Sequence, residues 1–120
     1  MEEASRGAHD AGGLVIGVLP NERKCPKRGY PNKYVDIPIY TGMSDARNAI
    51  NAKTSDVIVA LKGGAGTLSE MALAIKSGTP VVGLGCPAID IDTGGLFVRV
   101  SSVEEAMREV KKFLRKPLTE

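Results

Sequence analysis

The sequence has no tryptophan, two phenylalanines, three tyrosines, one histidine and two cysteines among its 120 residues. Proteins that stack nucleic-acid bases rely on aromatic side chains, so this scarcity argues against a nucleic-acid partner. A net charge of +2 is also too small to grip a phosphate backbone. A single histidine makes a Ser-His-Asp triad or a structural zinc site a poor expectation. We therefore expect neither bound metal nor nucleic acid.

Long hydrophobic runs are also lacking, because no stretch approaches the 18 or so apolar residues of a membrane span. The opening segment Met1–Arg6 has neither the charge pattern of a transit peptide nor the apolar run of a secretory signal. The two cysteines, Cys25 and Cys86, form no paired motif, which is typical of reduced thiols. The sequence thus predicts a cytoplasmic protein without a membrane partner.

What the chain does contain is typical of one globular domain. Its hydrophobic fraction is 42% and its charged fraction 25%, and 120 residues can bury one real core. We therefore expect a single domain over residues 1–120.

Apolar runs alternate with helical patterns along the whole chain. Such continuous runs are typical of parallel strands buried on both faces. Pro38 moves its strand toward an edge position. The predicted fold is α/β: a Rossmann-like open, mainly parallel sheet with helices on both faces, in three α/β/α layers. Strands are expected at 14–19, 35–40, 57–61, 80–84 and 97–100, and helices at 1–11, 43–54, about 67–77 and 102–115.

The clearest of these helices is the last one. Ser102 and Glu105 have the spacing of a capping box at its start. Its apolar residues recur with helical period and predict the face that packs on the sheet. These residues are Val103, Met107, Val110 and Leu114.

A glycine-rich segment joins the apolar run 57–61 to the following helix. Glycines let a backbone approach a ligand closely, and a helix start offers free N–H groups with partial positive charge. The segment fits neither a P-loop nor the Gly-x-Gly-x-x-Gly pattern. A structural alternative is a tight turn in which Thr67 and Glu70 form a capping box. The candidate phosphate-binding residues are Gly63, Gly64, Ala65, Gly66 and Thr67.

A second candidate segment, Tyr40–Asn48, also has a glycine turn before a helix. Arg47 could hold a phosphate or carboxylate with two parallel hydrogen bonds, although a solvated surface arginine is the plain alternative. Because this helix precedes the strand that bears the glycine-rich loop, we expect Arg47 at the mouth of the same crevice. Thr41, Gly42 and Asn48 are the accompanying candidates.

The run Gly63-Gly64-Ala65-Gly66-Thr67-Leu68-Ser69-Glu70 resembles the Pro-Gly-Gly-x-Gly-Thr-x-x-Glu hallmark of the LOG (Lonely guy) family, related to the DNA-processing protein DprA and long misnamed "lysine decarboxylases". Lys62 stands where that family has proline. The resemblance extends from Met1 to Pro20 and through Ala46-Arg47-Asn48, and it is closest to a small subgroup that includes molybdenum-cofactor carriers.

The resemblance implies one of two functions. Members of the enzymatic branch cleave nucleoside 5'-monophosphates to base and ribose 5-phosphate, with a catalytic arginine and glutamate that correspond to Arg47 and Glu70. The carrier subgroup implies binding of a nucleotide or molybdopterin-type anion without turnover and without any required cofactor. We favour a carrier or sensor, because Ala46 and Asn48 replace the acid and lysine that flank the arginine in the enzymes.

The resemblance also implies a homodimer or higher homo-oligomer. Family members begin with a strand–helix–strand unit that has no counterpart in residues 1–120. We therefore expect the strand at 14–19 to lack neighbours, and the reading frame upstream of Met1 to encode a further unit of this kind.

Overall fold

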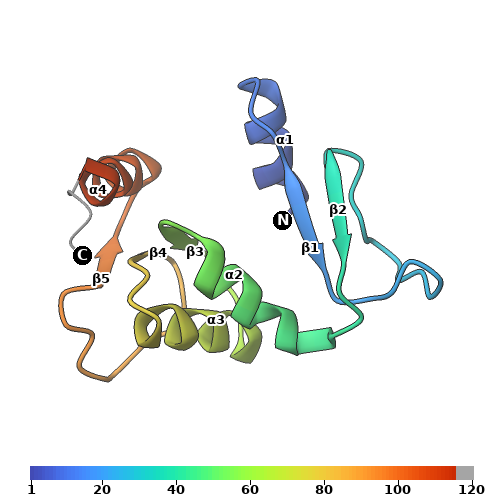
Figure 1. Ribbon diagram of the computed structural model, residues 1–120. Coiled ribbons are helices and arrows are strands. Elements are labelled where there is room, and N and C mark those ends of the chain that lie inside the picture. The colour runs from blue at the N-terminus through green and yellow to red at the C-terminus, as the bar shows by residue number, and fades with distance from the viewer. Residues whose placement is uncertain (116–120) are drawn as a thin grey trace. The chain divides into compact units, whose positions relative to one another are not determined.

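A computed structural model describes residues 1–115 of the chain. They form two compact units, residues 1–47 and residues 48–115, each with its own parallel sheet (Figure 1). Within residues 1–115, every helix is too short or too polar to cross a bilayer.

The first unit contains helix α1 (Glu2–Asp10), strands β1 (Ile16–Leu19) and β2 (Ile37–Tyr40), and the 3-10 turn η1 (Ser44–Arg47). β1 and β2 pair in parallel, with Ile16 opposite Ile37. The backbone N–H of Val15 also donates to the Asp36 carboxylate at 2.8 Å, which fixes this register. The expected strands at 14–19 and 35–40 are thus present, each shortened by about two residues at its start.

The expectation that the run 14–19 is buried on both faces is wrong for this unit. Leu14 is 66% and Ile16 53% exposed, although Val15 and Leu19 are buried. The physical reason is that, among the described strands, β1 pairs with β2 alone. A two-stranded sheet buries few of its own side chains. The strand at 14–19 was expected to lack neighbours, whereas β1 pairs with β2 along its whole length.

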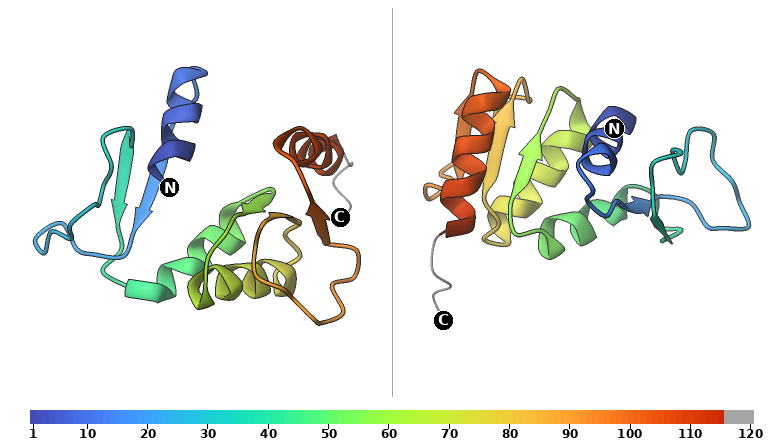
Figure 2. Two further views of the ribbon diagram at one scale, coloured as in Figure 1. Left: turned by 180° about the vertical axis from the view of Figure 1, so that it is seen from behind. Right: turned by 90° about the horizontal axis from the view of Figure 1, so that it is seen from above.

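The second unit has the predicted three layers. Its sheet has the order β3-β4-β5, all parallel, formed by Ile58–Ala60, Val81–Leu84 and Phe97–Val100. Helices α2 (Asn48–Thr54) and α3 (Ala65–Lys76) cover one face, and α4 (Val103–Arg115) covers the other (Figure 2). The expected helix 43–54 consists of the 3-10 turn η1 followed by α2. Positive φ values at Gly42 (63°) and Ser44 (50°) lie outside the helical region and explain why no regular helix begins at Met43.

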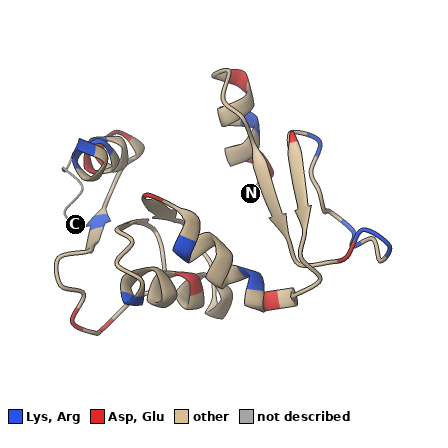
Figure 3. Cartoon of the chain, viewed as in Figure 1, with Lys and Arg blue, Asp and Glu red and all other residues tan. Residues whose placement is uncertain are grey.

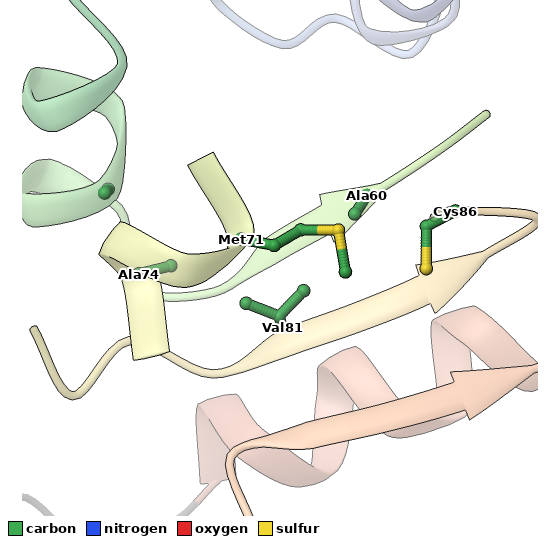
Figure 4. Close-up of a cluster of buried hydrophobic side chains, with 6 residues drawn as sticks. Ala60, Met71, Ala74, Val81 and Cys86 are labelled. Atoms are coloured by element: carbon green, nitrogen blue, oxygen red, sulfur yellow. The ribbon is translucent and has the colours of Figure 1, made fainter. Parts of the chain in front are cut away.

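Two adjacent residues of β4 show how both faces are filled. Val81 and Val82 are fully buried and point to opposite faces, as the strand period requires. Val81 packs with Met71, Ala74 and residues of the α2–α3 face (Figure 4). Val82 packs with Val100 and Ala106 under α4.

The buried face of α4 differs from the predicted one. Ala106, Val110 and Phe113 pack on the sheet, whereas Val103, Met107 and Leu114 are 62%, 48% and 56% exposed. The small Ala106 gave no strong hydrophobic signal, yet its size lets the helix approach the strands. The capping prediction is confirmed at Ser102, whose hydroxyl accepts the N–H of Glu105 at 3.1 Å.

Replacing Thr79 with valine is expected to lower the free energy of unfolding by about 1–2 kcal/mol. The Thr79 hydroxyl donates to the Ala52 carbonyl at 2.7 Å, and both residues are buried. That carbonyl belongs to the last turn of α2, where the helix itself supplies no donor. Urea denaturation measures the loss, with exposed Thr54→Val as the control; equal losses in the two variants would contradict the assignment.

Candidate functional site

The glycine-rich turn of the second unit begins directly after β3 and opens α3. The helix begins at Ala65, two residues earlier than expected, with Gly64 as its N-cap and no side-chain capping bond. The N–H groups of the first turn therefore have no intrahelical acceptor and carry the positive end of the helix dipole. Residues 62–66 are exposed, so these donors can reach a ligand.

The three glycines of this turn have different roles. A Cβ at Gly63 would collide with the side chain of Thr67, which folds back over it. A Cβ at Gly64 or Gly66 would meet nothing within 4 Å. Glycine at 63 is thus explained by packing within the turn, while the space beside 64 and 66 is open to a ligand.

Glu70 does not act as the helix cap. Because α3 begins at Ala65, Glu70 stands in the second turn, and the Thr67–Glu70 capping box is wrong. Its half-buried carboxylate instead accepts a hydrogen bond from the side-chain amide of Asn51 at 2.9 Å. The bond holds one oxygen of Glu70 against α2 and fixes the direction of the carboxylate.

Asn48 is brought to the same end of α3. It is 7% exposed, and its side-chain amide lies 3.5 Å from the Gly66 carbonyl, a long contact. Asn48 and Asn51 are three residues apart and thus share one face of α2. That spacing was a signal from which Asn51, overlooked in the sequence, could have been found.

In the first unit, Thr41 and Gly42 shape the turn after β2. The Thr41 hydroxyl donates to the Leu19 carbonyl at 2.7 Å and accepts the Met43 N–H at 3.1 Å. A Cβ at Gly42 would lie 2.6 Å from Cγ of Glu22, and its φ of 63° also favours glycine. Both predicted residues therefore hold the loop at the carboxyl end of β1.

Arg47 lies beside the end of the same strand. One guanidinium nitrogen donates to the Val18 carbonyl at 2.9 Å, and the group stacks over the Tyr30 ring at 5.4 Å. A guanidinium has five N–H donors, and this bond uses one. Tyr30 gave no signal in the sequence, because it lies in a polar loop far from Arg47 along the chain.

Arg47 belongs to the first unit and Glu70 to the second. Their meeting at one crevice stays a prediction, as do the roles of all the site residues.

The basic loop before β2 is seen as the blue segments between β1 and β2 in Figure 3. Its residues are Arg23, Lys24, Lys27, Arg28 and Lys33, of which Lys27 and Lys33 lie over tyrosine rings. Residues 1–115 hold no group of three His, Cys, Asp or Glu side chains placed to bind a metal ion.

Parallel α/β layers and a glycine-rich strand-to-helix turn define the chain as a Rossmann-like protein of the LOG-related class. The SLOG cluster4 family matches residues 1–113, and the chain belongs to this family. The resemblance to LOG-related proteins is thereby confirmed.

Solved structures of the same fold include two proteins whose descriptions name a ligand. The molybdenum cofactor carrier protein MCP from Chlamydomonas reinhardtii is 42% identical with a TM-score of 0.82, covering 97% of this chain and 71% of that one. The molybdenum cofactor binding protein from Rippkaea orientalis is 38% identical with a TM-score of 0.80, covering 95% and 71%. These matches confirm the predicted open α/β fold.

A sequence relative is an uncharacterized protein from Archaeoglobus fulgidus. It is 40% identical over 89 residues, which are 74% of this chain. The matched part spans 56% of the length of that relative.

Proposed function

We propose that this chain binds a phosphate-bearing anion of the molybdopterin or nucleotide type at the glycine-rich start of α3 and acts as a carrier. The observation that carries the proposal is the exposed, uncapped N-terminus of α3, with open space beside Gly64 and Gly66. Backbone N–H groups and the helix dipole suit a phosphate at that position. Similarity to two molybdenum-cofactor proteins supports the choice of ligand class.

Arg47 supplies the second part of this proposal. With Thr41 and Gly42 holding its loop, the guanidinium would add charge-assisted hydrogen bonds to the anion. Asn48 would complete the binding residues from α2. We retain one nucleotide-binding domain over residues 1–120 as part of the proposal, with no cofactor needed beyond the carried ligand.

The proposal also includes a location and an assembly. Free cysteines at positions 25 and 86 support a reducing, cytoplasmic compartment. A homodimer through α3 is supported by Leu68, a large apolar side chain that is 37% exposed on that helix.

The test of ligand identity is mass spectrometry of small molecules released from purified, undialysed protein. Calorimetric titration then compares AMP with a phosphopterin. A released phosphopterin that rebinds supports the carrier; failure of both probes to bind in the micromolar range overturns the proposal.

A second candidate function is hydrolysis of nucleoside 5'-monophosphates. The observation that favours it is the fixed carboxylate of Glu70, one turn beyond Gly66 and held by Asn51. A carboxylate can stabilise the positive charge that develops on ribose when a glycosidic bond breaks, or activate a water molecule.

Glu70→Gln separates structural from functional roles. Glutamine keeps an oxygen that accepts the Asn51 amide, so we expect the melting temperature to stay within about 2 °C of the parent value. If Glu70 acts on a substrate, kcat falls by about 10²–10⁴-fold. Release of ribose 5-phosphate from AMP is the measurement. No release by the parent protein, together with altered phosphopterin affinity in the variant, favours the carrier.

Asn51→Ala is the matched control, because it frees the Glu70 carboxylate without removing it. If Glu70→Gln and Asn51→Ala both leave binding and turnover unchanged, the role of Glu70 is purely structural.

A further inference from the structure

The basic loop gathers positive charge after the carboxyl end of β1 (Figure 3). Residues 20–34 contain five lysines and arginines and one acidic residue, Glu22. A backbone hydrogen bond joins the start of this loop to the turn before Arg47, because the Pro20 carbonyl accepts the Ser44 N–H at 3.0 Å. The basic loop and the turn that leads to Arg47 are therefore held together within the first unit.

A tight turn in the middle of the loop presents Lys27. The Tyr30 N–H donates to the Lys27 carbonyl at 3.0 Å and closes the turn. Gly29, the third of its four residues, has a φ of 85°, which is typical of a type II turn. The Lys27 ammonium lies 5.4 Å from the centre of the Tyr30 ring. The turn thus holds a cation and an aromatic ring side by side.

Arg47 lies against the same ring. Its guanidinium carbon is also 5.4 Å from the centre of the Tyr30 ring. Arg47 and Lys27, which are far apart in sequence, are therefore no farther from each other than twice that distance. Among the described residues, neither cation forms an ion pair with a carboxylate. Two like charges held at one ring are suited to an anion that has more than one charged group.

The shared ring lies where ligands of open sheets bind. Arg47 donates to the carbonyl of Val18, near the carboxyl end of β1, and ligands bind beyond the carboxyl ends of parallel strands. Neighbouring strands pair along the sides of a strand, and helices cover the faces of a sheet. Loops beyond the carboxyl end are left to meet a ligand.

We propose that Lys27, Arg47 and Tyr30 form a subsite for a second phosphate, so that the ligand of this chain carries a diphosphate. This inference rests on the proposed anion-binding function and specifies its ligand class. In that function one phosphate is matched by the start of α3 and by the guanidinium, and the Lys27 ammonium adds a further positive charge. Two linked phosphates present separate oxygens to separate cations. A terminal diphosphate, as in ADP, and one that links two groups, as in ADP-ribose, share this chemistry.

Calorimetric titration of AMP, ADP and ADP-ribose in the absence of divalent cations tests the subsite. We expect the parent protein to bind at least one of the two diphosphates about fivefold more tightly than AMP, which is the effect of one well-placed exposed ion pair. The probe that gains affinity shows whether the diphosphate is terminal or linking. Lys27→Ala should remove this preference and leave the affinity for AMP within about twofold of the parent value. Because the Lys27 side chain is exposed, the preference should also decline with added salt.

Lys33→Ala is the matched control. Lys33 belongs to the same loop and also lies over a tyrosine ring, that of Tyr34, at 5.2 Å. That ring contacts His9 of α1, with ring centres 5.8 Å apart, instead of Arg47. Lys33→Ala should therefore keep the preference for a diphosphate. Both lysines are in an exposed or half-exposed loop, so both variants are expected to fold, and circular dichroism verifies this.

Three results would overturn the second-phosphate subsite. The first is that neither diphosphate binds more tightly than AMP. The second is a preference that Lys27→Ala leaves unchanged. The third is an equal loss of preference in both lysine variants, which would assign it to the general charge of the loop. Equal binding of all three probes contradicts this inference alone, whereas failure of all three to bind contradicts the proposed function as well.

Discussion

Replacing Arg47 with alanine is expected to weaken binding of a phosphate-bearing anion by about 1.5–3 kcal/mol, or roughly 10- to 150-fold in the dissociation constant. The guanidinium gives one N–H to Val18 and lies over Tyr30, which holds it at the carboxyl end of β1. Ligands of open α/β sheets bind at that end of the strands. Calorimetric titration of AMP and a phosphopterin measures the change.

Arg99→Ala is the matched control for this experiment. Arg99 also donates to backbone carbonyls, of Cys86 and Pro87, and also stacks over a ring, that of Phe97. Its loss removes the same kinds of contact in the second unit, outside the candidate site. Equal effects of the two substitutions on affinity would mean that Arg47 acts only through folding.

Met71→Ala is expected to lower the free energy of unfolding by about 2–5 kcal/mol. Met71 is fully buried, and its side chain lies between α3 and the sheet beside Ala60 and Val81 (Figure 4). Both neighbours are rigid parts of β3 and β4, so they cannot close the cavity that alanine leaves. Urea denaturation followed by circular dichroism gives the value.

Leu68→Ala tests the same helix at a position that is 37% exposed, and we expect a loss below about 1 kcal/mol there. If both substitutions cost the same, the core under α3 is not packed as described. Ligand binding should survive Leu68→Ala, because the side chain is not among the candidate site residues.

The sequence predicted element types well, since strands such as 80–84 are short apolar runs between glycine and proline signals. It did not predict where α3 begins. Glycine at 64 and 66 has low helix propensity, which favoured a later start, but packing of Met71 and Ala74 on the sheet sustains the extra turn. The buried face of α4 was also predicted wrongly. Helical periodicity shows which side chains are apolar, but it does not show which of them the sheet covers.

The glycine-rich turn between β3 and α3 was predictable, because one motif carries it, although residues 65–67 belong to the helix and not to the loop before it. The binding role of these residues stays a prediction. The partners of these residues were not predictable, because Asn51 reaches Glu70 and Tyr30 reaches Arg47 only through tertiary folding. Motif reading finds the residues that a ligand would meet, and misses those that hold them in place.

Gly64, the N-cap of α3, has no side chain that could cap the helix, and this affects how the stability of the chain could be raised. A serine there has room and would add a few tenths of a kcal/mol by capping the first turn of α3. Its hydroxyl would then occupy an N–H group that the proposed ligand needs. If the proposed ligand binds there, stability and binding oppose each other at the start of α3, and a substitution chosen for stability alone would weaken binding.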